Sequence, residues 1–211
     1  MTRQGFTALL LAASAAVPAS LSAQENAPPE AQNSVQDSVQ DSVIVAAGQA
    51  ENASGRVAIN LAAGNGNQQA GAAAIAIGDT ALAGISLDQM SVAGGAGDRA
   101  TRIAIGPRAF AGIQGLASVN ITAGQNNQSA NLAGLAIGTG GALTDIALSQ
   151  SSAPTGPKGA PDADLQAGND SIDISSDAFL GGSGLLQVNL VGGERNSSAN
   201  TFVLSVSGNG N

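Results

Sequence analysis

The sequence predicts an all-β protein made of three stacked strand–turn–strand repeats, an open β-solenoid with cross-β layers. One block recurs three times without a gap, at residues 57–71, 117–131 and 186–200. Each copy opens with aliphatic residues alternating with small or polar ones, which is the period of a β-strand. A segment rich in Gly and Asn follows, where the chain can reverse. A fixed register of repeated residues indicates repeated structural units rather than one unique active site.

The first copy shows why the repeats must stack. Val57, Ile59 and Leu61 alternate with small or polar residues, so one face of this strand is aliphatic. After the turn at Gly64, the chain continues in small and aliphatic residues to Gly78. An isolated hairpin of this kind is only marginally stable in water. We therefore expect the copies to pair along their edges, layer upon layer.

Asparagines inside the strand pattern coincide in all three copies. The offsets of Asn60, Asn120 and Asn189 are 60 (120 − 60) and 69 (189 − 120). In-register stacking places such side chains in one column, where amides can form a ladder. We therefore expect a ladder here, whereas Asn65 and Asn126, which vary between copies, are expected to serve the turn alone.

The rest of the chain divides around the repeats. Arg3, an apolar run at 6–17 and small residues at 20–23 predict a secretion signal, and the run is too short to span a bilayer. The extension at 85–89 resembles 146–150 with one residue inserted, which predicts about four short strands per unit. The expected segments are a signal peptide (1–23), a disordered acidic lead-in (24–43), repeat 1 (44–89, with a first strand at 44–48), a Gly/Ala-rich connection (90–113), repeat 2 (114–150), a Pro/Gly linker (151–170) and repeat 3 with a polar tail (171–211).

The third unit is expected to carry its own upstream strand. Ala178-Phe179 precedes it as Ala109-Phe110 precedes the second unit, at the same offset of 69 (178 − 109).

Composition argues against several classes of function. The chain has no His and no Cys, so a Ser–His or Cys–His nucleophile pair and a disulfide framework are impossible. No cluster of residues indicates a metal or cofactor site. A net charge of −8 disfavours nucleic acid, and we assign Arg99, Arg102 and Arg108 to a solvated face. We therefore expect a protein that is not an enzyme.

The repeats resemble those of the Fap-type functional amyloids, which are secreted subunits of bacterial biofilm fibres. INLAAGNGNQQAGAAAIA (59–76) and, more loosely, VNITAGQNNQSANLAGLA (119–136) carry the resemblance. The shared pattern is a strand ending in Asn, a small-Ala-Gly turn, an Asn-Gln segment and Ala-rich residues. Combining the repeat register with this resemblance gives the candidate ladder and turn positions Asn60, Gly64, Asn67, Gln68, Asn120, Gly124, Asn127, Gln128, Asn131, Asn189, Gly193, Asn196 and Asn200.

The resemblance implies a function outside the cell. It implies self-assembly into extracellular amyloid-like fibres that support biofilm or surface adhesion. It also implies export through the periplasm and a dedicated outer-membrane pore, with the chain itself and related fibril subunits as partners. Because no segment after the signal is long and apolar enough for a membrane helix, we expect no insertion into the membrane. The paired-cysteine motif common near the end of the family's subunits is missing, so three roles stay open: a main subunit, a nucleator or a distant relative.

Two other architectures share parts of the pattern. IAIGDTALAG (75–84) and IAIGPRAFAG (103–112) resemble the β-roll repeats of trimeric autotransporter adhesins, which would bind a surface partner without forming fibres. Their spacing is 28 (103 − 75), twice the usual distance of about fourteen residues in that fold. A curlin-like subunit is a further alternative, although its regularly spaced Ser- and Gln-framed repeats are missing here.

Overall fold

The expected all-β architecture is confirmed. A computed structural model describes residues 41–92, 100–152 and 169–208. The predicted signal peptide, most of the lead-in, most of the linker and Arg99 lie outside these residues. The described strands are β1 (Asp41–Val45), β2 (Ser54–Ala63), β3 (Gln68–Ser91), β4 (Thr101–Ile105), β5 (Gln114–Ala123), β6 (Gln128–Ser152), β7 (Ser171–Ile174), β8 (Ser183–Val191) and β9 (Ser197–Ser207).

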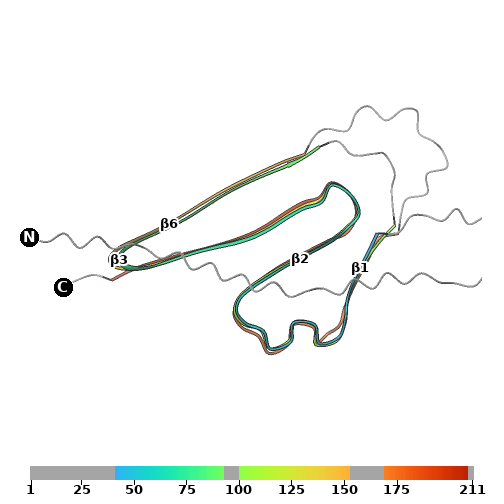
Figure 1. Ribbon diagram of the computed structural model, residues 1–211, viewed down its shortest axis with the longest axis horizontal. Helices are drawn as coiled ribbons and strands as arrows, with labels where there is room; N and C mark the ends of the chain where they lie inside the picture. The colour runs from blue at the N-terminus through green and yellow to red at the C-terminus, as the bar shows by residue number, and fades with distance from the viewer. Residues whose placement is uncertain (1–40, 93–99, 153–168, 209–211) are drawn as a thin grey trace, which may run out of the picture.

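The strands form three layers that stack in register. Layer 1 is β1–β3, layer 2 is β4–β6 and layer 3 is β7–β9, and the layers pair through parallel sheets ordered β1-β4-β7, β2-β5-β8 and β3-β6-β9. Figure 1 looks down the stack, and the coloured traces of the three layers nearly superimpose. Asn60 pairs with Asn120, and Asn120 pairs with Asn189, which is the register predicted from the repeats.

Within one layer the chain follows a winding path (Figure 1). β3 and β6 each bend back on themselves, and the register between them shifts between Gly78 and Thr80. This shift is where the second layer contains the inserted residue inferred from the sequence. Each of the first two layers therefore has three strands in four straight runs, because the third strand is bent.

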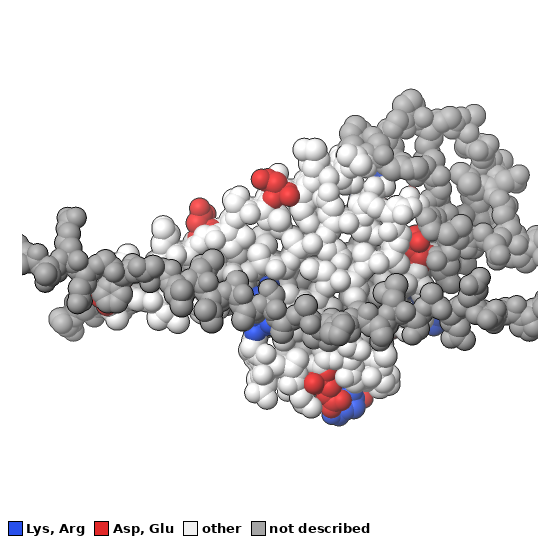
Figure 2. All heavy atoms as spheres, in the orientation of Figure 1, with Lys and Arg blue, Asp and Glu red and all other residues white. Residues whose placement is uncertain are grey.

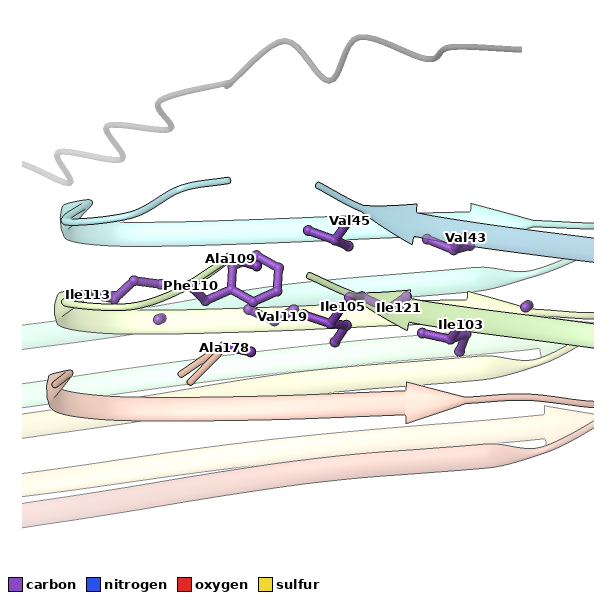
Figure 3. Packing of buried hydrophobic residues seen from close by; sticks show 12 residues of the cluster. Val43, Val45, Ile103, Ile105, Ala109, Phe110, Ile113, Val119, Ile121 and Ala178 are labelled. Carbon is purple, nitrogen blue, oxygen red and sulfur yellow. The ribbon is translucent and has the colours of Figure 1, made fainter. Parts of the chain in front are cut away.

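The main apolar core lies between the first and second sheets. Alternate residues of β1 and β4 face those of β2 and β5, and the side chains of Ile103, Val119 and Ile121 are completely buried. Phe110 belongs to this core (Figure 3), and its ring stacks on Phe179 of the next layer at 5.2 Å between centroids. A smaller cluster of alanines joins the two limbs of the bent strands. Small side chains let these limbs approach closely, so a chain with few aromatics can still form a dry interior.

Burial differs sharply between layers although their chemistry is similar. β5 and the first limb of β6 are almost completely buried. In β2 the matching residues alternate between exposed and half-buried, and in β8 most of them alternate between half-buried and buried. The middle layer is covered on both sides by its neighbours. The outer layers each keep one face open.

Several boundaries differ from those expected. The first strand begins at Asp41 rather than Ile44, within the expected lead-in. The segment 90–113, expected to be a connection, contains β4 and the buried Phe110. The short apolar element at 103–106 resembles 75–78 in sequence, but β4 pairs with β1 and β7 rather than with β3. The third unit does carry its own upstream strand, β7.

The aromatic stack gives a test of the core. Phe110 is 1% exposed, and its counterpart Phe179 lies in an outer layer and is only half-buried. We expect Phe110→Ala to lower the free energy of unfolding by about 3–5 kcal/mol and Phe179→Ala to lower it by clearly less. Urea unfolding of freshly prepared monomer, followed by circular dichroism, measures both. Equal losses would contradict the layered burial.

Candidate assembly interface

The inner column of asparagines runs through all three layers. Asn120 Nδ2 donates to Asn60 Oδ1 at 2.8 Å, and Asn189 Nδ2 donates to Asn120 Oδ1 at 3.0 Å. The same amide nitrogens also donate to the carbonyls of Ala70 and Ala130. Asn120 is fully buried. Its burial costs little because both ends of its amide are hydrogen-bonded.

A second pair of asparagines flanks this column in layers 2 and 3. Asn131 donates to Asn120 Oδ1 at 2.9 Å, and Asn200 donates to Asn189 Oδ1 and to Asn131 Oδ1, both at 3.0 Å. In layer 1 the same register position is Gly71. The polar column is thus two amides wide in layers 2 and 3 and one amide wide in layer 1.

The turn between the second and third strands has its own asparagine column. Asn67 Oδ1 accepts from the backbone N–H of Asn127 at 3.0 Å, and Asn127 Oδ1 accepts from that of Asn196 at 2.8 Å. Each amide nitrogen donates to turn carbonyls, for example Asn67 Nδ2 to Gly124 O at 2.8 Å. These side chains tie each turn to the next layer.

The turn glycines are required by both conformation and space. Gly64, Gly124 and Gly193 have φ angles of 93°, 115° and 85°, in the left-handed region that side chains disfavour. A Cβ on Gly124 would lie 1.9 Å from the carbonyl oxygen of Gly193 in the next layer. Any larger residue here would push neighbouring layers apart.

Glutamines outside the candidate ladder and turn positions form further contacts. Gln150 Nε2 donates to Gln89 Oε1 at 2.7 Å, and Gln69 Nε2 donates to Thr122 Oγ1 at 2.7 Å. The signal for the first pair was present, since both matching extensions end in Gln. Gln128 Nε2 donates to Gln68 Oε1 over a longer distance, 3.5 Å, and also donates to the Ser151 carbonyl at 2.8 Å.

Charged groups lie at the rim of the layers. Figure 2 shows a mostly uncharged face with charged side chains at its edges. Arg108 pairs with Glu51, whose hydrogen bond raises the pKa of Arg108, and Arg102 lies 3.8 Å from Asp173. The hydrogen bond from the Ser175 hydroxyl lowers the pKa of Asp177. These exposed groups form no converging site.

The described residues contain no group of three or more His, Cys, Asp or Glu placed to hold a metal ion. Within the same residues there is no helix long and apolar enough to cross a membrane. What the geometry presents is a set of repeated columns that end at two open faces.

The family comparison agrees with this arrangement. The sequence model of the functional amyloid protein FapB/FapC family matches residues 20–207. The chain belongs to the FapB/FapC family. This family consists of structural amyloid proteins rather than enzymes, and the repeated columns described above belong to a protein of this family. No curated protein and no solved structure matches the chain.

The two adhesin-like blocks do not form equivalent layers. Ile75 lies in β3 and pairs with Leu135, whereas Ile103 lies in β4 and pairs with Val43 and Ile172. In a β-roll, successive blocks would stack on one another. Here the blocks belong to different sheets, which removes the main support for the adhesin architecture.

The inner column and the turn should respond differently to a negative charge. Asn120→Asp removes the donor to Asn60 and Ala70 and buries a carboxylate between two neutral amides. Asn126 is also buried, at 5% exposed, but it lies in the turn, where the positively charged Arg195 holds the corresponding position of the next layer. We expect Asn120→Asp to lengthen the lag of fibre formation several-fold and to lower stability by about 3 kcal/mol or more, and Asn126→Asp to have a much smaller effect. Thioflavin-T kinetics and urea unfolding measure this difference. Equal lag times for the two variants would argue against the ladder.

Proposed function

We propose that this chain polymerises end to end into extracellular fibres that support a biofilm or surface adhesion. The observation that carries the proposal is the unequal burial of equivalent residues. Asn120 and Ile121 are 0% exposed in the middle layer, whereas their layer 1 counterparts Asn60 and Leu61 are exposed and half-buried. A second copy stacked in the same register would bury the outer layers as the middle one is buried.

The hydrogen-bonding groups at the two open faces are complementary. In the inner column, each amide nitrogen donates toward layer 1, so Asn60 Nδ2 would meet Asn189 Oδ1 of the copy stacked on it. In the turn column, the N–H of Asn67 would likewise meet Asn196 Oδ1 of that copy. The joint between copies would then continue the columns with one direction throughout. Such head-to-tail contacts do not close, so they generate a filament.

The strand edges support the same joint. Layer 1 and layer 3 each present unpaired backbone N–H and C=O groups along their outer edges, which are templates for adding another parallel strand. The edge residues are mainly small, amide or aliphatic, so little repulsion opposes stacking.

Export of the chain rests on the sequence. The charged, apolar and small-residue pattern of residues 1–23 supports secretion into the periplasm. From there we propose passage through a dedicated outer-membrane pore, with further copies and related fibril subunits as partners outside the cell.

The first test is fibre formation by the purified chain. We expect thioflavin-T-positive fibres whose diffraction shows reflections near 4.7 and 10 Å. A stable monomer or a discrete trimer without fibres after days of incubation would overturn the proposal and favour an adhesin.

A disulfide test checks the order of the layers. Ser42 and Ser171 are exposed and align with Arg102 from opposite sides, so they are two layers apart within one copy, about 9.6 Å. Across a head-to-tail joint they would be about 4.8 Å apart, which a disulfide can span. Because the chain has no native Cys, we expect oxidised fibres of Ser42→Cys/Ser171→Cys to give a ladder of cross-linked multimers on a non-reducing gel.

The single-cysteine chains are the matched controls. Ser42→Cys alone and Ser171→Cys alone should stay monomeric on the gel, because like positions in a head-to-tail fibre are three layers apart. Dimers from either single variant would indicate a head-to-head joint instead.

Two carboxylates should slow growth at the joint. Thr101 separates Asp41 from Asp170 within one copy, but head-to-tail stacking places Asp170 next to Asp41 of the neighbouring copy. Asp170→Asn keeps the oxygen that accepts from Thr101 and removes the charge, so we expect faster seeded elongation at low salt and a smaller difference at high salt. Asp173→Asn is the matched control, because Ile44 holds the corresponding position of layer 1. The same acceleration in both variants would show an effect of net charge alone.

A further inference from the structure

Layer 1 differs from the other layers at two register positions that lie side by side. Where layers 2 and 3 carry Asn131 and Asn200, layer 1 carries Gly71. Where layers 2 and 3 carry Leu116 and Leu185, layer 1 carries Arg56. Both differences occur in the layer that forms one open face of the stack. They therefore lie at the proposed joint between copies.

The Arg56 side chain lies beside the vacant asparagine position. Its Nη2 is 3.6 Å from where a Cβ on Gly71 would be, and its Nη1 donates to the Val57 carbonyl at 2.8 Å. Arg56 is half-buried although Ala58 and Asn60, on the same strand face, are exposed. Partial burial lowers the pKa of its guanidinium, and the ion pairs of the described residues involve other arginines. A guanidinium has five N–H donors, so most of them are available at this open face.

The opposite face presents a matching acceptor. Inside the molecule, Asn131 Oδ1 accepts two hydrogen bonds from layer 3, from Asn189 Nδ2 and from Asn200 Nδ2. By the same register, Asn200 Oδ1 would accept from the next copy. Asn60 corresponds to Asn189 and can supply one donor, but Gly71 corresponds to Asn200 and has no side chain to supply the other.

We propose that the Arg56 guanidinium supplies the missing donor, so that layer 1 of one copy recognises Asn200 Oδ1 in layer 3 of its neighbour. This inference rests on the head-to-tail stacking proposed above. It assigns to Arg56 a contact between copies that neither internal junction contains.

The position of Arg56 in a single layer fits this role. An arginine in every layer would stack like charges about 4.8 Å apart, which strongly disfavours a column. One arginine in every three layers separates the charges by about 14 Å, beyond the screening length of roughly 8 Å at physiological ionic strength. A cationic donor is therefore tolerable in this column once per copy.

Elongation of wild-type and variant full-length chains, each from its own sonicated seeds, tests the contact. We expect Arg56→Leu, which makes layer 1 match Leu116 and Leu185, to slow elongation about three- to tenfold, because Asn200 Oδ1 loses a charge-assisted hydrogen bond. Arg56→Leu/Gly71→Asn restores the amide pair of the other layers and should recover the wild-type rate. Gly71 has no positive φ, and the atom nearest to a new Cβ is the Ser118 hydroxyl oxygen, which can rotate away.

Two further variants keep the result decisive. Arg56→Lys retains a cationic donor and should elongate faster than Arg56→Leu, even if the double variant were to lose its β-sheet circular dichroism. Arg102→Leu removes the same charge from an exposed site away from the Asn200 column and should elongate like the wild type.

The outcomes separate the two proposals. The role of Arg56 is overturned, and the stacking is left intact, if the wild-type chain forms fibres and Arg56→Leu elongates as fast as the wild type or as fast as Arg102→Leu. Failure of both Arg56→Lys and the double variant to elongate faster than Arg56→Leu overturns it as well. A wild-type chain that forms no fibres overturns the stacking and this inference together.

Discussion

Parallel in-register pairing places every side chain against its counterpart in the next layer, about 4.8 Å away. Each column must therefore hold residues that tolerate their own neighbours. Amides do so well, because one end donates while the other accepts, as Asn120 donates to Asn60 and accepts from Asn189. Aliphatic and small residues also stack without penalty. Charges do not, which explains why the charged side chains lie at the rim or in columns where the neighbouring layer carries a neutral residue, as Thr101 does between Asp41 and Asp170.

The same constraint explains how a chain with 2% aromatic residues forms a stable interior. The layers are thin, and each pair of facing strands needs only one row of apolar side chains, such as Ile103 against Val119 and Ile121. The rest of the interior is a hydrogen-bonded amide network and a cluster of alanines. Low apolar bulk per residue is therefore compatible with a dry core, provided that every buried amide finds its partners in adjacent layers.

In a stack of three layers, only the middle layer has both of its faces covered by neighbouring layers. The outer layers carry the same residue types as the buried layer but keep one face open to water. This difference links the fold of one copy to the amyloid nature of its family. The two faces are nonetheless unlike each other, since Gly71 and Arg56 are confined to layer 1 and Asp170 extends from layer 3. Because of these differences, the side chains that would meet at a joint between copies are not the same as those that meet at the junctions inside the molecule.

The sequence by itself determined the number of layers, their register and the position of the turns. It could do so because identical residues recur at fixed offsets, and in-register stacking turns a linear repeat directly into a spatial column, as for Asn67, Asn127 and Asn196. Only the tertiary structure decided how each layer winds within its plane. That path determines which limbs lie side by side, and hence that Gln128 donates to the Ser151 carbonyl, that β4 interrupts the expected connection and that Arg56 lies beside Gly71. These contacts join segments with no common repeat signal, and they depend on how closely small side chains let neighbouring limbs approach.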